Sequence, residues 1–185
     1  GRTVAYIAQS AAAAFNPSMS IMEQVIESAL IHGTLSRHEA QAKAVELFRA
    51  LALPDPEGIG ARYPHQVSGG QLQRLMPAMA LITDPALVIL DEPTTALDVT
   101  TQIEVLRAFK RVVRELGTTA VYVSHDLAVV AQMADRIVVL RNGQIQENSS
   151  TEQILIEPEH PYTRSLLSAM KPTASRDTAD QGAGP

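Results

Sequence analysis

The sequence predicts an α/β protein whose strands form a parallel sheet. In the second half of the chain, apolar runs over residues 86–90 and 118–124 alternate with helical segments, an order typical of parallel sheets. A third apolar run with β-branched residues, over residues 4–8, is also predicted to be a buried strand. Polar residues follow all three runs. Because reactive groups gather where parallel strands end, we expect these polar residues to share one edge of the sheet.

The first half of the chain is predicted to be mostly helical. Residues 10–17 are small and end in Asn-Pro, which predicts a loop. Ser18 or Ser20 can cap a helix that Gly33 ends. The S-x-x-E sequence over residues 36–39 is a capping box and predicts the start of a second helix.

Ser68 is predicted to cap a third helix, which Asp84-Pro85 ends. Pro77 lies inside this helix, where a proline removes a hydrogen bond, produces a kink and costs roughly 3 kcal/mol in an isolated helix. The tail over residues 173–185 has no periodicity and is expected to be disordered. The other expected elements are helices over 100–116, 127–134, 151–156 and 161–170, and a hairpin of 137–141 and 144–146 around Asn142-Gly143.

Composition excludes several classes of protein. A length of 185 residues suffices for one domain with a sizeable core. The net charge of −5 does not favour nucleic-acid binding, which usually shows a basic surface, and the absence of cysteine excludes disulfides. No apolar run approaches the roughly 18 residues that span a bilayer, and no signal peptide is recognisable. We therefore expect a soluble, cytoplasmic protein.

Two carboxylates, Asp91 and Glu92, directly follow an apolar strand. A buried strand can present them at the sheet edge, where water and Mg²⁺ have access. Hydrolysis of ATP requires a carboxylate near the metal and a group that orients or deprotonates water. Asp91 can assist in holding Mg²⁺ and Glu92 can act as the general base. The alternative is that either carboxylate only caps a following helix.

A polar turn with two glycines, Val67-Ser68-Gly69-Gly70-Gln71, opens the third helix. Free amide groups and the positive end of the helix dipole form an anion site, and the glycines let backbone approach a phosphate closely. The alternative is an ordinary capped turn. His125 also follows a strand, and its imidazole can bind a phosphate or serve only as a satisfied histidine. The Ser124-His125-Asp126 run is not a hydrolase triad, because adjacent residues point in different directions.

From residue 9 to about residue 172, the chain resembles the ATPase of an ATP-binding cassette (ABC) transporter. The resemblance rests on Gln9, the turn 67–71, Asp91-Glu92, the segment 94–98 and Ser124-His125, which match in order the Q-loop, signature, Walker B, D-loop and H-loop motifs. It implies a P-loop NTPase-like (RecA-like) α/β core with an inserted helical subdomain. It also implies ATP and Mg²⁺ as cofactors.

The resemblance implies a role for each matched residue. Gln9 touches the metal or the attacking water, Asp91 assists the metal, and Glu92 and His125 carry hydrolysis. Ser68, Gly69, Gly70 and Gln71 contact the γ-phosphate held by the opposite subunit, and Asp98 crosses the interface of a head-to-tail dimer of homologous ATPase subunits. Taken alone, Gln9 could be an ordinary polar residue after a strand, and Asp98 could be the N-cap of the next helix.

Three segments are similar to one subfamily, the dipeptide, oligopeptide and nickel importers. They are Phe15-Asn16-Pro17, residues 91–100 and the segment His160–Leu167. This similarity implies transmembrane permease subunits as partners, with contact near Gln9 to His32, and a peripheral position on the cytoplasmic face of the inner membrane. It does not imply a nucleic-acid partner.

The usual phosphate loop, G-x-x-x-x-G-K-[ST], does not occur in the sequence. We therefore expect residues 1–172 to be a partial ATPase domain, with the helical subdomain over about 10–83, core over 84–148 and a C-terminal extension over 149–172. The isolated chain is expected to bind ATP poorly, to lack turnover and to aggregate through an exposed sheet edge and face.

Two other functions are weighed against this hypothesis. A non-catalytic interaction module would donate Ser68 and Gly70 to the nucleotide of a complete ATPase partner. A soluble ABC protein of DNA repair or translation is disfavoured, because the chain lacks a basic face and carries the segment His160–Leu167.

Overall fold

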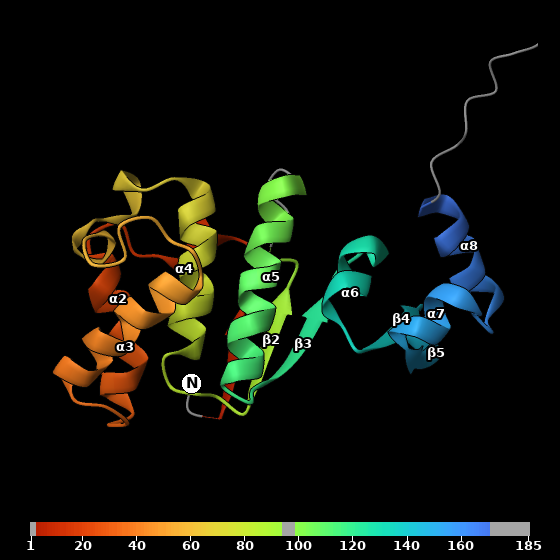
Figure 1. Ribbon diagram of the computed structural model, residues 1–185, viewed down its shortest axis with the longest axis horizontal. Helices are drawn as coiled ribbons and strands as arrows, with labels where there is room; N and C mark the ends of the chain where they lie inside the picture. The colour runs from red at the N-terminus through yellow and green to blue at the C-terminus, as the bar shows by residue number, and fades with distance from the viewer. Residues whose placement is uncertain (1–2, 94–98, 171–185) are drawn as a thin grey trace, which may run out of the picture. The chain divides into compact units, whose positions relative to one another are not determined.

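The computed structural model describes residues 3–93 and 99–170. Contacts within the chain divide it into two compact units, which we call unit 1 (up to Met133) and unit 2 (from Ala134). Figure 1 labels their elements. The predicted tail over residues 173–185 lies outside the described residues.

The sheet of unit 1 has three parallel strands in the order β1-β2-β3. Its register pairs Ile7 with Leu90, and Leu90 with Tyr122. The expectation of a parallel sheet is therefore confirmed, although the central strand lies far from β1 in sequence. The strands are β1 (Val4–Ile7), β2 (Leu87–Asp91) and β3 (Thr119–Val123).

Helices with side-chain caps form the segment between β1 and β2. Ser20 caps α2 by accepting the amide of Glu23, and Ser36 and Glu39 form the predicted capping box of α3. The chain then passes through two short 3₁₀ turns before α4. The bounds are α2 (Ile21–Ile31), α3 (Arg37–Ala50), η1 (Ile59–Ala61), η2 (Pro64–Gln66) and α4 (Gly69–Leu81).

The loop predicted over residues 10–17 is partly wrong, because it contains the short helix α1 (Ala11–Ala14). The Ser10 hydroxyl accepts the amide of Ala13 at 3.3 Å and caps this turn. Alanine has the highest helix propensity, so a run of four can form one turn once it is capped. The Asn16-Pro17 pair, which predicted the loop, lies after the end of this helix.

Helix α4 continues through Pro77 without interruption. Proline cannot donate the hydrogen bond that would reach the carbonyl of Gln73. The ring is buried, together with Met76 and Ala78 on either side of it. Burial of these apolar groups offsets the lost hydrogen bond.

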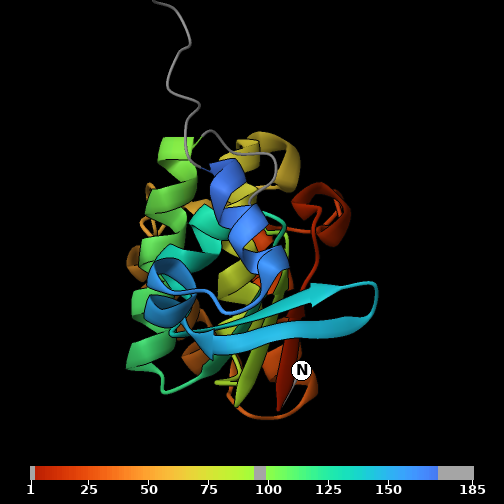
Figure 2. The same cartoon turned by 90° about the vertical axis from the view of Figure 1, so that its right-hand side faces the viewer.

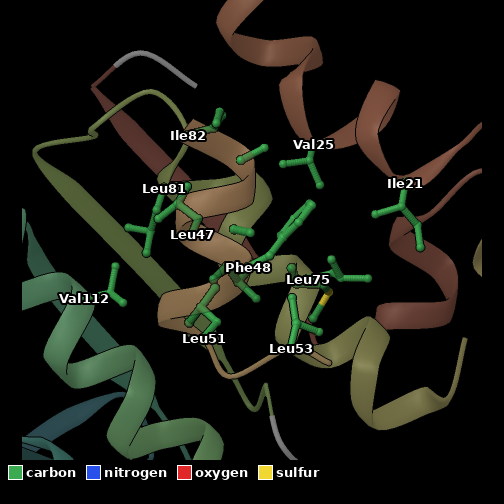
Figure 3. Packing of buried hydrophobic residues seen from close by; sticks show 14 of the residues in the cluster. Ile21, Val25, Leu47, Phe48, Leu51, Leu53, Leu75, Leu81, Ile82 and Val112 are labelled. Carbon is green, nitrogen blue, oxygen red and sulfur yellow. The ribbon is translucent and has the colours of Figure 1, made fainter. Parts of the chain in front are cut away.

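The core of unit 1 gathers side chains from α2, α3 and α4 (Figure 3), and one face of the sheet adds buried residues to it. Along β1, Ala5 and Ile7 are 7% and 2% exposed, whereas Val4 and Tyr6 are 46% and 60% exposed. The exposed face continues over Val121 and Val123 of β3. An exposed sheet face was expected from the sequence, and this part of the expectation is confirmed. The remaining helices of unit 1 are α5 (Val99–Glu115) and α6 (Leu127–Met133).

Unit 2 is built on an antiparallel hairpin (Figure 2). Asn142 and Gly143 both have positive φ, as the predicted two-residue turn requires. Burial raises the pKa of Glu147, but the nearby Thr163 side chain and hydrogen bonds from the amides of Glu159 and His160 bring it below its ordinary value. The elements are β4 (Arg136–Arg141), β5 (Gln144–Ser150), which extends beyond its predicted end, α7 (Thr151–Ile156) and α8 (Pro161–Met170).

Candidate functional site

The carboxyl edge of the three-stranded sheet brings together polar residues from all three strand ends. Gln9 lies two residues past β1, Asp91 and Glu92 lie at the end of β2, and His125 lies two residues past β3. The amide of Glu92 donates to the carbonyl of Val123 at 3.0 Å, so β2 and β3 remain joined up to this point. Glu92 has a φ of 45°, a left-handed conformation that is strained for a residue with a side chain and is common at functional sites.

The carboxylate of Glu92 is held from both sides. Its Oε2 accepts a hydrogen bond from Nε2 of Gln9 at 3.2 Å, and its Oε1 lies 2.9 Å from Nδ1 of His125. Because Gln9 uses its amide nitrogen here, its side-chain oxygen is not needed for the contact with Glu92 and can accept from or bind another group. The arrangement fixes a carboxylate at the sheet edge next to two groups that can donate hydrogen bonds.

Asp91 has a different partner. Its Oδ2 accepts a hydrogen bond from the hydroxyl of Tyr6 at 2.8 Å, and this bond raises the pKa of Tyr6. Sequence analysis did not identify Tyr6 as a site residue. The register places Tyr6 beside Ile89, and Asp91 lies two residues further along the same face. Only this register, which the sequence does not reveal, brings the two side chains together.

The side chains of Ser124 and Asp126 both accept hydrogen bonds from backbone amides. The Ser124 hydroxyl accepts the amide of Asp126 at 3.0 Å, and the carboxylate of Asp126 accepts the amides of Ala128 and Val129 at the start of α6. These contacts agree with the conclusion that the run around His125 is not a hydrolase triad.

The hydrogen bond to Glu92, followed by its negative charge, raises the pKa of His125 above its ordinary value of about 6.5. The folded-state pKa exceeds the unfolded one, so the pair stabilises the fold below the unfolded pKa and loses this effect as pH rises through the folded pKa. We expect ¹H–¹³C NMR titration of the imidazole to give a raised pKa that falls in Glu92→Gln. A His125→Asn variant identifies the resonance, and an identical pKa in both proteins contradicts the contact.

The signature-like turn forms a second, separate group. The Ser68 hydroxyl accepts the amide of Gln71 at 3.2 Å, and Oε1 of Gln71 accepts the amide of Ser68 at 2.9 Å. A Cβ built at Gly69 meets nothing within 4 Å, so no contact inside the described chain requires glycine there. An open hollow of about 500 Å³ lies beside the turn, lined by Ala52, Leu53, Pro54, Ser68, Gly70, Gln71 and Arg74.

Comparison with known proteins identifies the family. The sequence model described as ABC transporter matches residues 1–95, just over half of the chain. The chain belongs to the ABC transporter family. The glutathione import ATP-binding protein GsiA of Escherichia coli K12 is 43% identical over 170 residues, which cover 92% of this chain and 27% of that protein. The metal-staphylopine import system ATP-binding protein CntD of Staphylococcus aureus Mu50 is 43% identical over 171 residues, covering 92% of this chain and 63% of that protein.

Solved ABC structures share the fold. The dimeric post-hydrolysis structure of the ATP-binding cassette MJ0796, bound to ADP and Pi, has a TM-score of 0.68 and 28% identity over 80% of this chain and 63% of that one. An ATP-binding subunit of an ABC transporter has a TM-score of 0.67, with 25% identity over 83% of this chain and 61% of that one. The predicted P-loop NTPase-like α/β fold is therefore confirmed.

The donor atoms at the sheet edge suit the magnesium ion associated with ABC ATPases. Residues 3–93 and 99–170 contain no group of three or more His, Asp or Glu side chains that could hold a metal by themselves. Mg²⁺ commonly takes one or two carboxylates and completes its shell with water and substrate phosphates. Oxygen atoms of Asp91 and Gln9 fit such a partial set.

Two further expectations concern the D-loop residue and membrane-spanning helices. Asp98, the D-loop residue of the ABC resemblance, lies outside them. Within residues 3–93 and 99–170, the structure contains no helix with the length and apolar character needed to cross a bilayer.

Proposed function

We propose that this chain belongs to the ATP-binding and ATP-hydrolysing subunit of an ABC importer for peptides or peptide-like molecules. The observation that carries the proposal is the Glu92 carboxylate, held between Gln9 and His125 at the end of a parallel sheet. The relatives are named for import of glutathione and of metal-staphylopine, which supports a small peptide-like cargo. The chain spans 63% or less of these relatives.

Each residue at the sheet edge has a distinct proposed role. Glu92 orients a water molecule and accepts its proton, while the hydrogen bonds from Gln9 and His125 keep its oxygens in place. Asp91 and the carbonyl oxygen of Gln9 hold Mg²⁺. When bound, Mg²⁺ neutralises charge that develops on the phosphates of ATP. His125 also donates a hydrogen bond toward the γ-phosphate.

The turn over Ser68, Gly69, Gly70 and Gln71 is proposed to contact ATP held by a second, homologous ATPase subunit. Ser68 and Gly69 are exposed at the start of a helix of 13 residues, and the amides of such a start attract anions. The open hollow beside the turn leaves room for another chain. A head-to-tail dimer then completes two sites, with Asp98 at the interface, and the dimeric structure of a similar ABC protein supports it.

Membrane permease subunits are the proposed partners of the helical segment. In such a complex the protein would lie on the cytoplasmic face of the inner membrane. A cleft of about 250 Å³ lies among β1, α1, α2 and α4 and includes Ala8, Gln24 and Glu27. Part of its lining comes from the segment Gln9 to His32, where the contact with the permease subunits is expected. In this scheme residues 10–83 transmit motion, 84–148 belong to the catalytic core and 149–172 form an extension. No role for nucleic acid is proposed.

The 185-residue chain, in which the phosphate-loop motif does not occur, is expected to show no Mg-ATP turnover by itself, because phosphate-loop amides and the loop lysine carry most triphosphate contacts. A phosphate-loop fusion, in which the phosphate-loop half of an ABC ATPase precedes Gly1, is expected to hydrolyse ATP. Phosphate release from both proteins is the measurement. Glu92-dependent turnover by the unfused chain contradicts the prediction, and an inactive, folded fusion contradicts the proposed function.

The second candidate is a module that donates its signature turn to a complete ATPase. The fully formed capping box at Ser68 and Gln71 favours it, since this group is assembled without a phosphate loop. ATP-dependent co-purification with a complete ATPase subunit, without turnover by the phosphate-loop fusion, would favour this candidate over the first.

A further inference from the structure

The two carboxylates at the end of β2 are held by separate sets of groups. Glu92 is held by Gln9 and His125, whereas Asp91 is held by Tyr6 alone among the contacts that the structure describes. Because their partners differ, the orientation of each carboxylate can be fixed independently of the other. The proposed catalytic scheme uses the partners of Glu92 but assigns nothing to Tyr6.

Tyr6 extends from the exposed face of the sheet. Its side chain is 60% exposed, between the buried residues Ala5 and Ile7 on β1. Its hydroxyl spans from β1 to the diagonal position on β2, a reach typical of aromatic side chains on neighbouring strands. A hydrogen bond from a hydroxyl to an ionised carboxylate is stronger than one between neutral groups. Because the side chain is exposed, the Tyr6 hydroxyl is held at this position by its 2.8 Å bond to Asp91 rather than by burial.

We propose that Tyr6 is a positioning residue that orients the carboxylate of Asp91 for Mg²⁺ and disfavours Ca²⁺. With Oδ2 bonded to the tyrosine hydroxyl, Oδ1 is the oxygen offered to a metal. Mg²⁺ accepts a single carboxylate oxygen in a strict octahedron, whereas Ca²⁺ often takes both oxygens of one carboxylate. Coordination through both oxygens competes with the bond from Tyr6. This inference rests on the proposed function, because it assigns Asp91 to the metal.

The first measurement tests orientation without any metal. Three-bond NMR couplings across the Asp91 Cα–Cβ bond report whether its side chain occupies one rotamer. We expect one dominant rotamer in the unmodified 185-residue chain and averaged couplings in Tyr6→Phe, which keeps the ring and removes only the hydroxyl. Tyr63→Phe, the same change at an exposed residue directly before η2, is the matched control and is expected to leave the couplings unchanged.

The second measurement uses Mn²⁺ as a probe for the metal. In the phosphate-loop fusion with a non-hydrolysable ATP analogue, which supplies the phosphate ligands, broadening of the Glu92 backbone amide is followed during titration with Mn²⁺, and then during competition by Mg²⁺ or Ca²⁺. The bond to Tyr6 forms without metal, so its loss acts through the freedom of the Asp91 side chain. Averaging over three staggered rotamers predicts that Tyr6→Phe weakens Mn²⁺ binding by up to about threefold. In the unmodified protein, Mg²⁺ is expected to displace Mn²⁺ at a lower concentration than Ca²⁺ does. This Mg²⁺ advantage is expected to shrink in Tyr6→Phe and to persist in Tyr63→Phe.

The outcomes separate the two proposals. Identical Asp91 couplings in the unmodified chain and in a folded Tyr6→Phe variant overturn the positioning role, whatever the metal result. Averaged couplings with an unchanged Mg²⁺ advantage support positioning and overturn the cation preference. If Mn²⁺ leaves the Glu92 amide sharp in the nucleotide-bound fusion, the metal role of Asp91 in the proposed function is overturned, while the couplings still decide the role of Tyr6.

Discussion

Replacement of Glu92 by glutamine in the phosphate-loop fusion is expected to lower kcat for Mg-ATP hydrolysis by about 10²–10⁴-fold, the usual effect of losing a general base. Glutamine has the same size, but its amide cannot accept the proton of an attacking water. In the structure the carboxylate oxygens face Nε2 of Gln9 and Nδ1 of His125. An amide placed there meets at least one donor with its own NH₂ group, so the hydrogen bonds to Gln9 and His125 are also disturbed.

Steady-state phosphate release over a range of ATP concentrations measures this effect. The KM for ATP is expected to change little, because Glu92 acts on water rather than on nucleotide binding. Glu46→Gln is the matched control: this glutamate is exposed on α3, and the same change there is expected to leave kcat unaltered. If kcat of Glu92→Gln stays within about threefold of that of the unmodified fusion, the assignment of Glu92 as general base is contradicted.

Replacement of Phe48 by alanine is expected to lower the free energy of unfolding of unit 1 by about 3–5 kcal/mol, the usual cost of a large cavity in a core. Phe48 is fully buried on α3. Figure 3 shows its ring between the helices, near Val25 of α2 and Leu75 of α4. Alanine leaves a space that these neighbours, fixed in their own helices, can fill only in part.

Urea unfolding of the 185-residue chain followed by circular dichroism measures the change, with the slope against urea expected to stay constant. Ile31→Ala is the control. Ile31 is 73% exposed at the end of α2, so its truncation is expected to cost less than about 0.5 kcal/mol. A loss below about 1 kcal/mol for Phe48→Ala means that the helices around α3 do not pack as the structure describes.

Local signals predicted many elements correctly because their physical cause lies within a few residues. The capping box at Ser36 and Glu39 satisfies backbone amides three residues apart, so it is readable before any packing is known. Asn142 and Gly143 tolerate positive φ, which a two-residue hairpin turn needs. Gly33 and Gly117 end helices with positive φ for the same reason.

Local signals failed where two of them competed. In the segment 10–17, a proline and small residues predicted a loop, but the cap from Ser10 and the helix propensity of alanine produced α1. At Pro77, the local rule gives only the cost of the lost hydrogen bond, whereas α4 continues through the proline, whose ring is buried. Both cases depend on contacts whose strength the sequence does not state.

The sequence by itself determined the parallel sheet, the capped helices and the meeting of Gln9, Glu92 and His125 at one edge, because the order of strands and helices dictates which ends of the strands coincide. Only the tertiary structure decided the atomic partners at that edge. A shift of one residue between β1 and β2 would turn Tyr6 or Asp91 to the opposite face. The hydrogen bond from Tyr6 to Asp91 therefore exists because packing selected one register, a choice made by contacts between segments far apart in the chain.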